Sequence, residues 1–293
     1  MSTTAVTATT QTLAVPGATL VYDVRRGGGD ASSPLMLIGS PMAAAGFGTL
    51  AGHFTDRTVI TYDPRGSERS ERADATAPLT PDLHADDLHR VIEAVGIGPV
   101  DLFASSGGAV NALALVVRHP EDVRTLVAHE PPLATLVPDR DAALAACRAI
   151  HDTYQRSGWG AAMAHFIAIV SHRGLFTDEI VRQAPPDPAA FGLPAQDDGS
   201  RTDPMLGHGI ISTTHYEPDL NALRASSARI VIAAGEASSG ELASRAAHAL
   251  AERLGTPVVL FPDGHGGFLG GEYGQTGEPE AFAARLREVL ERS

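Results

Sequence analysis

Apolar residues along the chain follow two alternating patterns. Short apolar or β-branched runs predict buried strands, and longer stretches with apolar residues three or four positions apart predict amphipathic helices. The predicted strands are residues 12–15, 19–25, 34–38, 58–62, 100–105, 123–128, 229–234 and 257–261. The predicted helices are residues 43–54, 80–95, 109–118, 240–254 and 279–292. Because strands and helices alternate, we expect an α/β fold with a mostly parallel sheet and right-handed crossovers.

The alternation stops in the middle of the chain, where no strand-like run occurs before residue 229. Residues 141–156 and 161–171 are helical by pattern, and residues 185–204 form a loop rich in Pro, Asp and Gly. We therefore predict a mostly helical lid, inserted after the sixth strand and covering a pocket in the core. The predicted domains are a core at 1–132 and 222–293 and a lid (cap) at 133–221.

Several side chains of this region are candidates to line a substrate pocket. They are Trp159, Phe166, His172 and Met205 of the lid, together with Met42 of the core. Amphipathic helices also need an apolar face for their own packing, so a purely structural role competes with substrate contact at each of the lid positions.

Charge and cysteine content narrow the cellular setting. The 293 residues carry a formal net charge of −13, contain no lysine and include one cysteine, Cys147. The negative field argues against nucleic acid or an anionic membrane surface as a partner, and a chain without lysine cannot form a Schiff base. The chain has no membrane-length apolar run, no apolar leader at the start and no possible disulfide, so we expect a cytoplasmic protein. The expected partner is a small-molecule substrate, and a homodimer is possible.

The first chemical signal is a sharp corner between a predicted strand and a predicted helix. The apolar run that begins at Val100 stops at Ser106, and glycines follow directly. In a nucleophile elbow, small residues two positions before and after the serine let strand and helix approach closely, so that the hydroxyl points out of the sheet. Ala104 and Gly108 occupy those positions. An ordinary Ser/Gly-rich turn would look the same, so further residues must decide.

A base for this serine is present near the end of the chain. Serine becomes a good nucleophile when an imidazole held by a carboxylate takes its proton. His265 alone among the 12 histidines follows the last predicted strand on a glycine-rich loop, where there is room for substrate. We therefore predict that His265 reaches Ser106.

Three motifs in this order resemble those of α/β-hydrolase-fold serine hydrolases, and the likeness covers nearly the whole chain. Residues 100–110 are similar to the elbow, 35–42 to the strand and oxyanion loop, and 62–70 to the loop after the fourth strand. The resemblance implies a mostly parallel, about eight-stranded sheet flanked by helices. It also implies that Asp63 and Arg65 hold a turn rather than catalyse.

The resemblance places an oxyanion hole at two backbone amides. The matching donors are Gly107, directly after the nucleophile, and Ser40, directly after Gly39. Ile38 stands where the family usually has a histidine, so one supporting hydrogen bond is missing. Because the hole itself uses backbone N–H groups, it does not depend on that histidine.

The carboxylate has two candidates. Most of the family has an Asp shortly after the strand that follows the lid, but residues 235–241 contain none, and Glu236 is the nearest substitute. Glu130 ends the strand that follows the elbow helix, so a parallel sheet brings it to the same edge as Ser106. Pancreatic lipases and zearalenone-type lactone hydrolases place the acid there, the latter as Glu. We favour Glu130 and keep Glu236 as the alternative.

These residues predict a serine hydrolase that cleaves a carboxylic ester or lactone of a mostly apolar small molecule through an acyl-enzyme. A perhydrolase, C–C bond hydrolase or lyase-like reaction on the same residues is the alternative within enzymes, and a noncatalytic binding protein of the same fold is the alternative outside them. No spacing of His, Cys, Asp or Glu resembles a zinc site and no phosphate-binding loop with lysine occurs, so we expect no metal and no cofactor.

Overall fold

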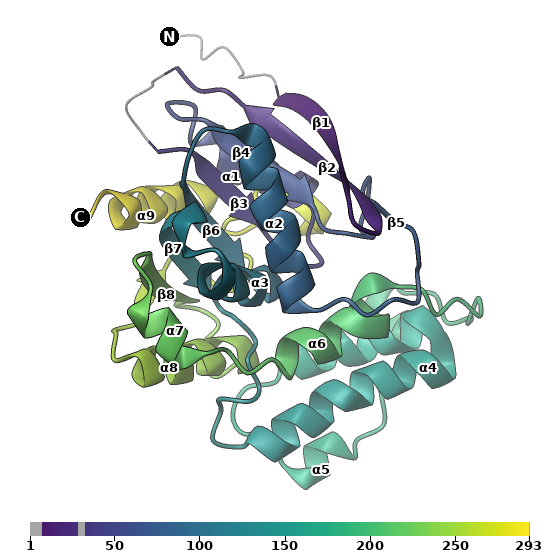
Figure 1. Cartoon of the computed structure of the whole chain (residues 1–293). Coiled ribbons are helices and arrows are strands. Elements are labelled where there is room, and N and C mark those ends of the chain that lie inside the picture. The colour runs from purple at the N-terminus through teal and green to yellow at the C-terminus, as the bar shows by residue number, and fades with distance from the viewer. Residues whose placement is uncertain (1–7, 29–32, 293) are drawn as a thin grey trace.

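The strands form one sheet that runs through the molecule (Figure 1). The computed structural model describes residues 8–28 and 33–292; residues 1–7 of the predicted core domain lie outside the described residues. The strands are β1 (Ala8–Val15), β2 (Ala18–Arg25), β3 (Leu35–Ile38), β4 (Val59–Asp63), β5 (Glu71–Arg72), β6 (Val100–Ser105), β7 (Val123–His129), β8 (Arg229–Gly235) and β9 (Val259–Phe261).

The sheet is mostly parallel, as the strand–helix alternation predicts. Its order is β1-β2-β4-β3-β6-β7-β8-β9, and the short β5 pairs with β2 outside this path. Contacts of β2 with β1, β4 and β5 are antiparallel, and every pair from β4–β3 to β8–β9 is parallel. The two residues of β5 show no apolar pattern, so the sequence did not predict this strand. The carboxyl ends of β3, β6 and β7 therefore meet at one edge near the centre of the sheet.

Helices of the core cover both faces of the sheet. They are the 3-10 helix η1 (Ala44–Phe47), α1 (Gly48–Gly52), α2 (Pro81–Val95), α3 (Gly107–Arg118), η2 (Pro120–Asp122), α8 (Leu242–Leu254), η5 (Glu272–Gly274) and α9 (Pro279–Glu291). Successive side chains of a strand point to opposite faces. Met36 and Ile38 accordingly join the apolar cluster under α2, α3 and α8, whereas Leu35 and Leu37 join the one under α1 and α9.

Helix α2 shows how local chemistry sets the boundaries of these elements. The side chain of Thr80 accepts a hydrogen bond from the amide of Leu83, and Pro81 occupies the first helical position, where no donor is needed. Gly96 ends the helix in the left-handed conformation, which a glycine adopts without strain. The predicted helix 80–95 is confirmed to within one residue.

Between β7 and β8 the chain is helical. The elements are α4 (Arg140–Val170), α5 (Asp178–Val181), η3 (Pro188–Phe191), the π-helix η4 (Met205–Gly209), α6 (Ile210–Thr214) and α7 (Leu220–Ala225). Helix α4 is broken at Gly158, where φ is 80°, so the predicted helices 141–156 and 161–171 are its two halves. In Figure 1, α4, α5 and α6 lie together beside the core. The predicted lid at 133–221 falls within this stretch; its bounds and its covering role stay predictions. No helix within the described parts of the chain is long and apolar enough to cross a membrane.

Candidate active site

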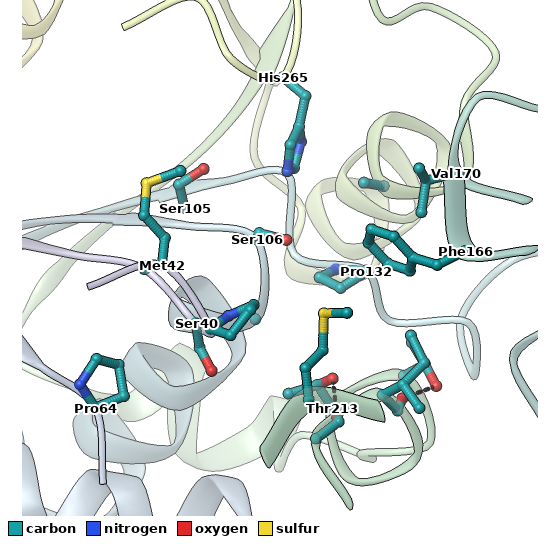
Figure 2. Close-up of a pocket in the computed structure, with 18 of the residues that line it drawn as sticks. Ser40, Met42, Pro64, Ser105, Ser106, Pro132, Phe166, Val170, Thr213 and His265 are labelled. Carbon is teal, nitrogen blue, oxygen red and sulfur yellow. Dashed lines mark hydrogen bonds between the residues drawn. The ribbon is translucent and has the colours of Figure 1, made fainter. Parts of the chain in front are cut away.

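Ser106 lies on a strained turn between β6 and α3. Its backbone has φ 59° and ψ −130°, a left-handed conformation that non-glycine residues seldom adopt, and α3 begins at the next residue. The amide of Ser106 donates to the carbonyl of His129 on the neighbouring strand at 3.0 Å, which anchors the turn. The side chain is partly exposed and lines a pocket (Figure 2).

The elbow packs directly on the loop after β3, and this contact explains both glycines. A Cβ atom at Gly108 would lie 2.7 Å from the Cα of Gly39, and one at Gly107 would lie 2.7 Å from the carbonyl oxygen of Ser40. Real Cβ atoms do not come so close to backbone, so only glycine fits at either place. The structure thus brings the backbone of Gly107 and Ser40 side by side next to Ser106.

Two charged residues support this arrangement: Asp63, which ends β4, and Arg65, in the loop that follows. The carboxylate of Asp63 accepts hydrogen bonds from the amide of Ala44 at 3.0 Å and from Arg69 Nε at 2.6 Å. The guanidinium of Arg65 donates twice to Asp87, at 2.8 and 2.6 Å, and both side chains are buried. These contacts hold the loops in place, which agrees with the structural role predicted for Asp63 and Arg65.

The carboxylate that meets His265 is Glu130. Its Oε2 lies 2.5 Å from Nδ1 of His265, and its side chain is fully buried directly after β7. The backbone of Glu130 is itself left-handed, with φ 51°, which turns the side chain off the strand direction. His265 is 40 % exposed, and its ring points toward Ser106 in Figure 2. No hydrogen bond joins the Ser106 hydroxyl to the ring among the described residues.

The loop after β8 contacts the Glu130 carboxylate. The amide of Gly235 donates to Oε1 of Glu130 at 2.9 Å, and the hydroxyl of Ser238 donates to the same oxygen. Glu236, the alternative acid, is exposed, and within the described residues its side chain has no hydrogen bond to His265. The structure therefore brings Glu130 to His265 and leaves Glu236 exposed on the surface.

The pKa values of the pair follow from burial and charge. Burial alone would raise the pKa of Glu130, but hydrogen bonds from His265 and Ser238 and the charge of the imidazole outweigh it and lower the pKa to about 2. For His265, burial lowers the pKa, while the bond to Glu130 and its negative charge outweigh this and raise the pKa above the ordinary value. The pair thus holds an ionised carboxylate beside an imidazole whose pKa is raised.

His129, next to Glu130, is not a second base. It is fully buried among Phe103, Phe261 and Phe282, with ring centroids 5.4 to 6.0 Å apart. Burial lowers its pKa to about 4, so the ring is neutral near pH 7. It packs against these aromatic rings and does not line the pocket.

The pocket has a volume of about 850 Å³ and is walled mainly by apolar side chains of the core and of α4, η4 and α6. Of the predicted substrate contacts, Met42, Phe166 and Met205 line it. Trp159 and His172 do not line it: Trp159 packs against the hydrophobic core, and the ring of His172 lies against that of Phe176, tilted by 42° with centroids 4.9 Å apart. The structure therefore does not bring these two predicted residues to the pocket, because Trp159 packs against the core and His172 contacts Phe176 instead.

Two polar residues at the site were not predicted. Ser238 lies in the stretch where the family usually has an Asp. Its polar side chain at that place was the feature of the sequence that could have marked it as a site residue. His84 lines the pocket from α2 while being only 6 % exposed, and its Nδ1 has no hydrogen-bond partner in the described parts of the chain. Burial lowers the pKa of His84 to about 4, which leaves a neutral polar group in an apolar wall. No sequence pattern singled it out among the residues of α2.

Comparisons with known proteins agree with this architecture. A family model described as alpha/beta hydrolase fold matches residues 43–147. A Bacillus subtilis (strain 168) protein, the uncharacterized hydrolase YraK, is 31% identical over 295 residues, which is 96% of each chain. Among solved structures, a thermophilic esterase from Thermogutta terrifontis superposes with a TM-score of 0.66 at 19% identity over 98% of both chains. MGS-M2, an alpha/beta hydrolase from a deep-sea metagenome, gives 0.68 at 15% identity over 97% of this chain and 98% of that one.

Proposed function

The chain belongs to the α/β-hydrolase family, and on this basis we propose that it is a serine hydrolase that cleaves a carboxylic ester or lactone of a mostly apolar small molecule. The observation that carries the proposal is the buried Glu130 carboxylate paired with His265 at 2.5 Å, beside a serine on a strained elbow. Ser106, directly after β6, and His265, after β9, line the same apolar pocket, and Glu130, directly after β7, contacts His265. Serine hydrolysis requires a nucleophile, a base that takes its proton and a carboxylate that orients the base. Ser106, His265 and Glu130 are the residues proposed for these three roles.

In the proposed mechanism, Nε2 of His265 takes the proton of Ser106 as the hydroxyl oxygen attacks the substrate carbonyl. Glu130 accepts the hydrogen bond of Nδ1, which leaves Nε2 unprotonated and stabilises the imidazolium that forms. His265 then gives the proton to the leaving alkoxide, and an acyl-enzyme remains on Ser106. Water, activated by His265 in turn, releases the acid product.

The amides of Gly107 and Ser40 are the proposed donors to the tetrahedral oxyanion. Their support comes from the contact between the elbow and the loop after β3, which fixes both backbones before substrate binds. Donors that need no reorganisation contribute most to catalysis, and removing one typically lowers kcat about 10²- to 10³-fold. The lid, residues 133–221, supplies the opposite wall through Phe166 and Met205.

Hydrolysis of a graded substrate panel tests the proposal. We expect p-nitrophenyl esters to be cleaved with kcat/KM rising from acetate to medium acyl chains, because the pocket wall is apolar. Macrolactones belong in the panel because the predicted place of the acid resembles that of zearalenone-type lactone hydrolases. If the folded protein binds these esters without turning any of them over, it is a binding protein and the proposal is wrong.

The activity should depend on pH through His265. The base must be neutral to accept the proton of Ser106, and its pKa is raised by Glu130. We therefore expect kcat/KM to fall as pH decreases through a midpoint above 6.5, the ordinary value for histidine. In Glu130→Gln the negative charge is lost, so the midpoint of the residual activity should move to lower pH. A pH series for both proteins measures the two midpoints; the same midpoint in both would contradict the pairing.

Gly108→Ala tests whether the close contact of elbow and loop shapes the oxyanion hole. The new Cβ would lie 2.7 Å from Gly39, so the loop that includes Ser40 must shift. We expect kcat for p-nitrophenyl butyrate to fall about 10²- to 10³-fold, the effect of one lost donor. Gly52→Ala, at a glycine with open space around a Cβ, is the control and should retain wild-type activity. Wild-type kcat in Gly108→Ala would show that the contact does not position the donors.

A further inference from the structure

Resting on the proposed function, we propose that Ser238 is a positioning residue that fixes the Glu130 carboxylate for His265. Ser238 is 1 % exposed, on the loop after β8. Its hydroxyl and the amide of Gly235 both donate to Oε1 of Glu130, while Oε2 accepts from His265. The two carboxylate oxygens therefore have different partners: the loop after β8 donates to Oε1, and the imidazole of His265 donates to Oε2.

A glutamate at this place needs such a fixed oxygen. Its side chain has one more rotatable bond than that of aspartate, and a buried rotamer-rich side chain must be held to present one oxygen to its partner. Gly235 supplies one donor from the backbone, and Ser238 supplies the one side-chain donor to Oε1 among the described residues. Removing the hydroxyl leaves Gly235 as the one described donor to Oε1, so the carboxylate is held less firmly in the orientation that meets His265.

The Ser238 hydroxyl has a second acceptor within reach, the carbonyl of Gly235 at 3.0 Å. A hydroxyl has one proton and donates it to one acceptor at a time. Hydrogen bonds to an ionised carboxylate are roughly twice as strong as those to a neutral group, so Glu130 receives the proton. When the carboxylate is absent, Gly235 remains as an acceptor, and Ser238 stays satisfied.

The same loop also contacts the loop that holds His265. The amide of Ala237 donates to the carbonyl of Asp263 at 2.8 Å, and a Cβ on Gly235 would lie 2.7 Å from the backbone of Gly264. Residues 235–238 are thus packed against both partners of the pair. Ser238 is the side chain through which this loop acts on the carboxylate, so its effect on the reaction should pass through Glu130.

The test is a double-mutant cycle on ester hydrolysis. Ser238→Ala is compared with Ser239→Ala, a change at the neighbouring, exposed serine, and each is made in the wild-type and in the Glu130→Ala background. Rates are measured with p-nitrophenyl butyrate, and the slow variants are also measured with a fluorophosphonate probe. In the wild-type background we expect Ser238→Ala to lower kcat about 10- to 100-fold, the worth of a hydrogen bond to a charged group, with KM within about twofold. Ser239→Ala should leave kcat unchanged.

In the Glu130→Ala background, Ser238→Ala should change the residual rate by less than about twofold, because the carboxylate through which it acts is gone. The downfield proton resonance of His265 Nδ1–H should also weaken or shift in Ser238→Ala and stay unchanged in Ser239→Ala. Equal losses in both backgrounds would mean that Ser238 only stabilises its loop and would overturn the proposal, as would an unchanged kcat. An inactive wild type would instead refute the serine-hydrolase function itself.

Discussion

Ser106→Ala should abolish ester hydrolysis, with kcat falling on the order of 10⁴- to 10⁶-fold. The nucleophilic oxygen is lost, and the donors at Gly107 and Ser40 can only stabilise attack by water. The substitution should not disturb the fold, because within the described residues the Ser106 side chain makes no hydrogen bond that alanine would lose. Steady-state hydrolysis of p-nitrophenyl butyrate, with thermal unfolding as a check on folding, measures the effect.

Ser105→Ala is the matched control for this variant. Ser105 is the neighbouring serine, is buried, and contacts the buried His129 at 3.3 Å rather than the pair at the pocket. We expect it to keep kcat within about tenfold of the wild type. If Ser105→Ala were inactive while Ser106→Ala retained turnover, the nucleophile would be assigned to the wrong serine.

Glu130→Gln should lower kcat about 10⁴-fold, the second largest effect. The amide keeps the size of the side chain but can present an N–H to His265 Nδ1. The ring then carries its proton on Nε2 and cannot accept one from Ser106, so the loss comes from the wrong tautomer rather than from a displaced ring. Binding of substrate depends on the pocket, and KM should change little.

Glu236→Gln provides the comparison for Glu130→Gln. The side chain of Glu236 is exposed and has no contact with His265 in the described parts of the chain, so we expect kcat within about twofold of the wild type. If Glu236→Gln loses most of its turnover and Glu130→Gln does not, the acid is Glu236, and the loop after β8 must rearrange when substrate binds.

Local patterns were sufficient to predict most of the fold. Most strands of the parallel sheet are short apolar runs with Gly or Pro nearby, and such a run can be recognised without knowing which distant residues pack against it. The elbow and His265 were predicted for the same reason, since a serine at a strand-to-helix corner and a histidine after the last strand are each visible within about ten residues. The two-residue β5 has no such pattern and is held by its pairing with β2.

The acid could be narrowed to two residues but not chosen with certainty from the sequence. Both Glu130 and Glu236 end a strand of the parallel sheet, so each could reach the same edge. The choice depends on the left-handed backbone at Glu130 and on the two donors from the loop after β8, which lie more than 100 positions away in the chain. Packing between distant loops of this kind leaves no local pattern.

The lid residues show the same limit. Met205 and Phe166 line the pocket, whereas Trp159 and His172 lie on the same long helix or directly after it and do not. Trp159 and Phe166 lie seven positions apart in the half of α4 that follows the break at Gly158, so helical spacing places them on the same face. Which of the two reaches the pocket depends on how α4 packs against the core, and the spacing alone does not indicate it.

Trapping a covalent intermediate tests the central claim most directly. Wild-type protein, Ser106→Ala and Glu130→Gln are each treated with a fluorophosphonate and, separately, with a slowly hydrolysed p-nitrophenyl ester, and the intact mass and the modified peptide are determined by mass spectrometry. We expect one adduct per wild-type chain, located on Ser106, slower labelling of Glu130→Gln and no adduct on Ser106→Ala. An active wild type that carries no adduct on Ser106 would contradict the account.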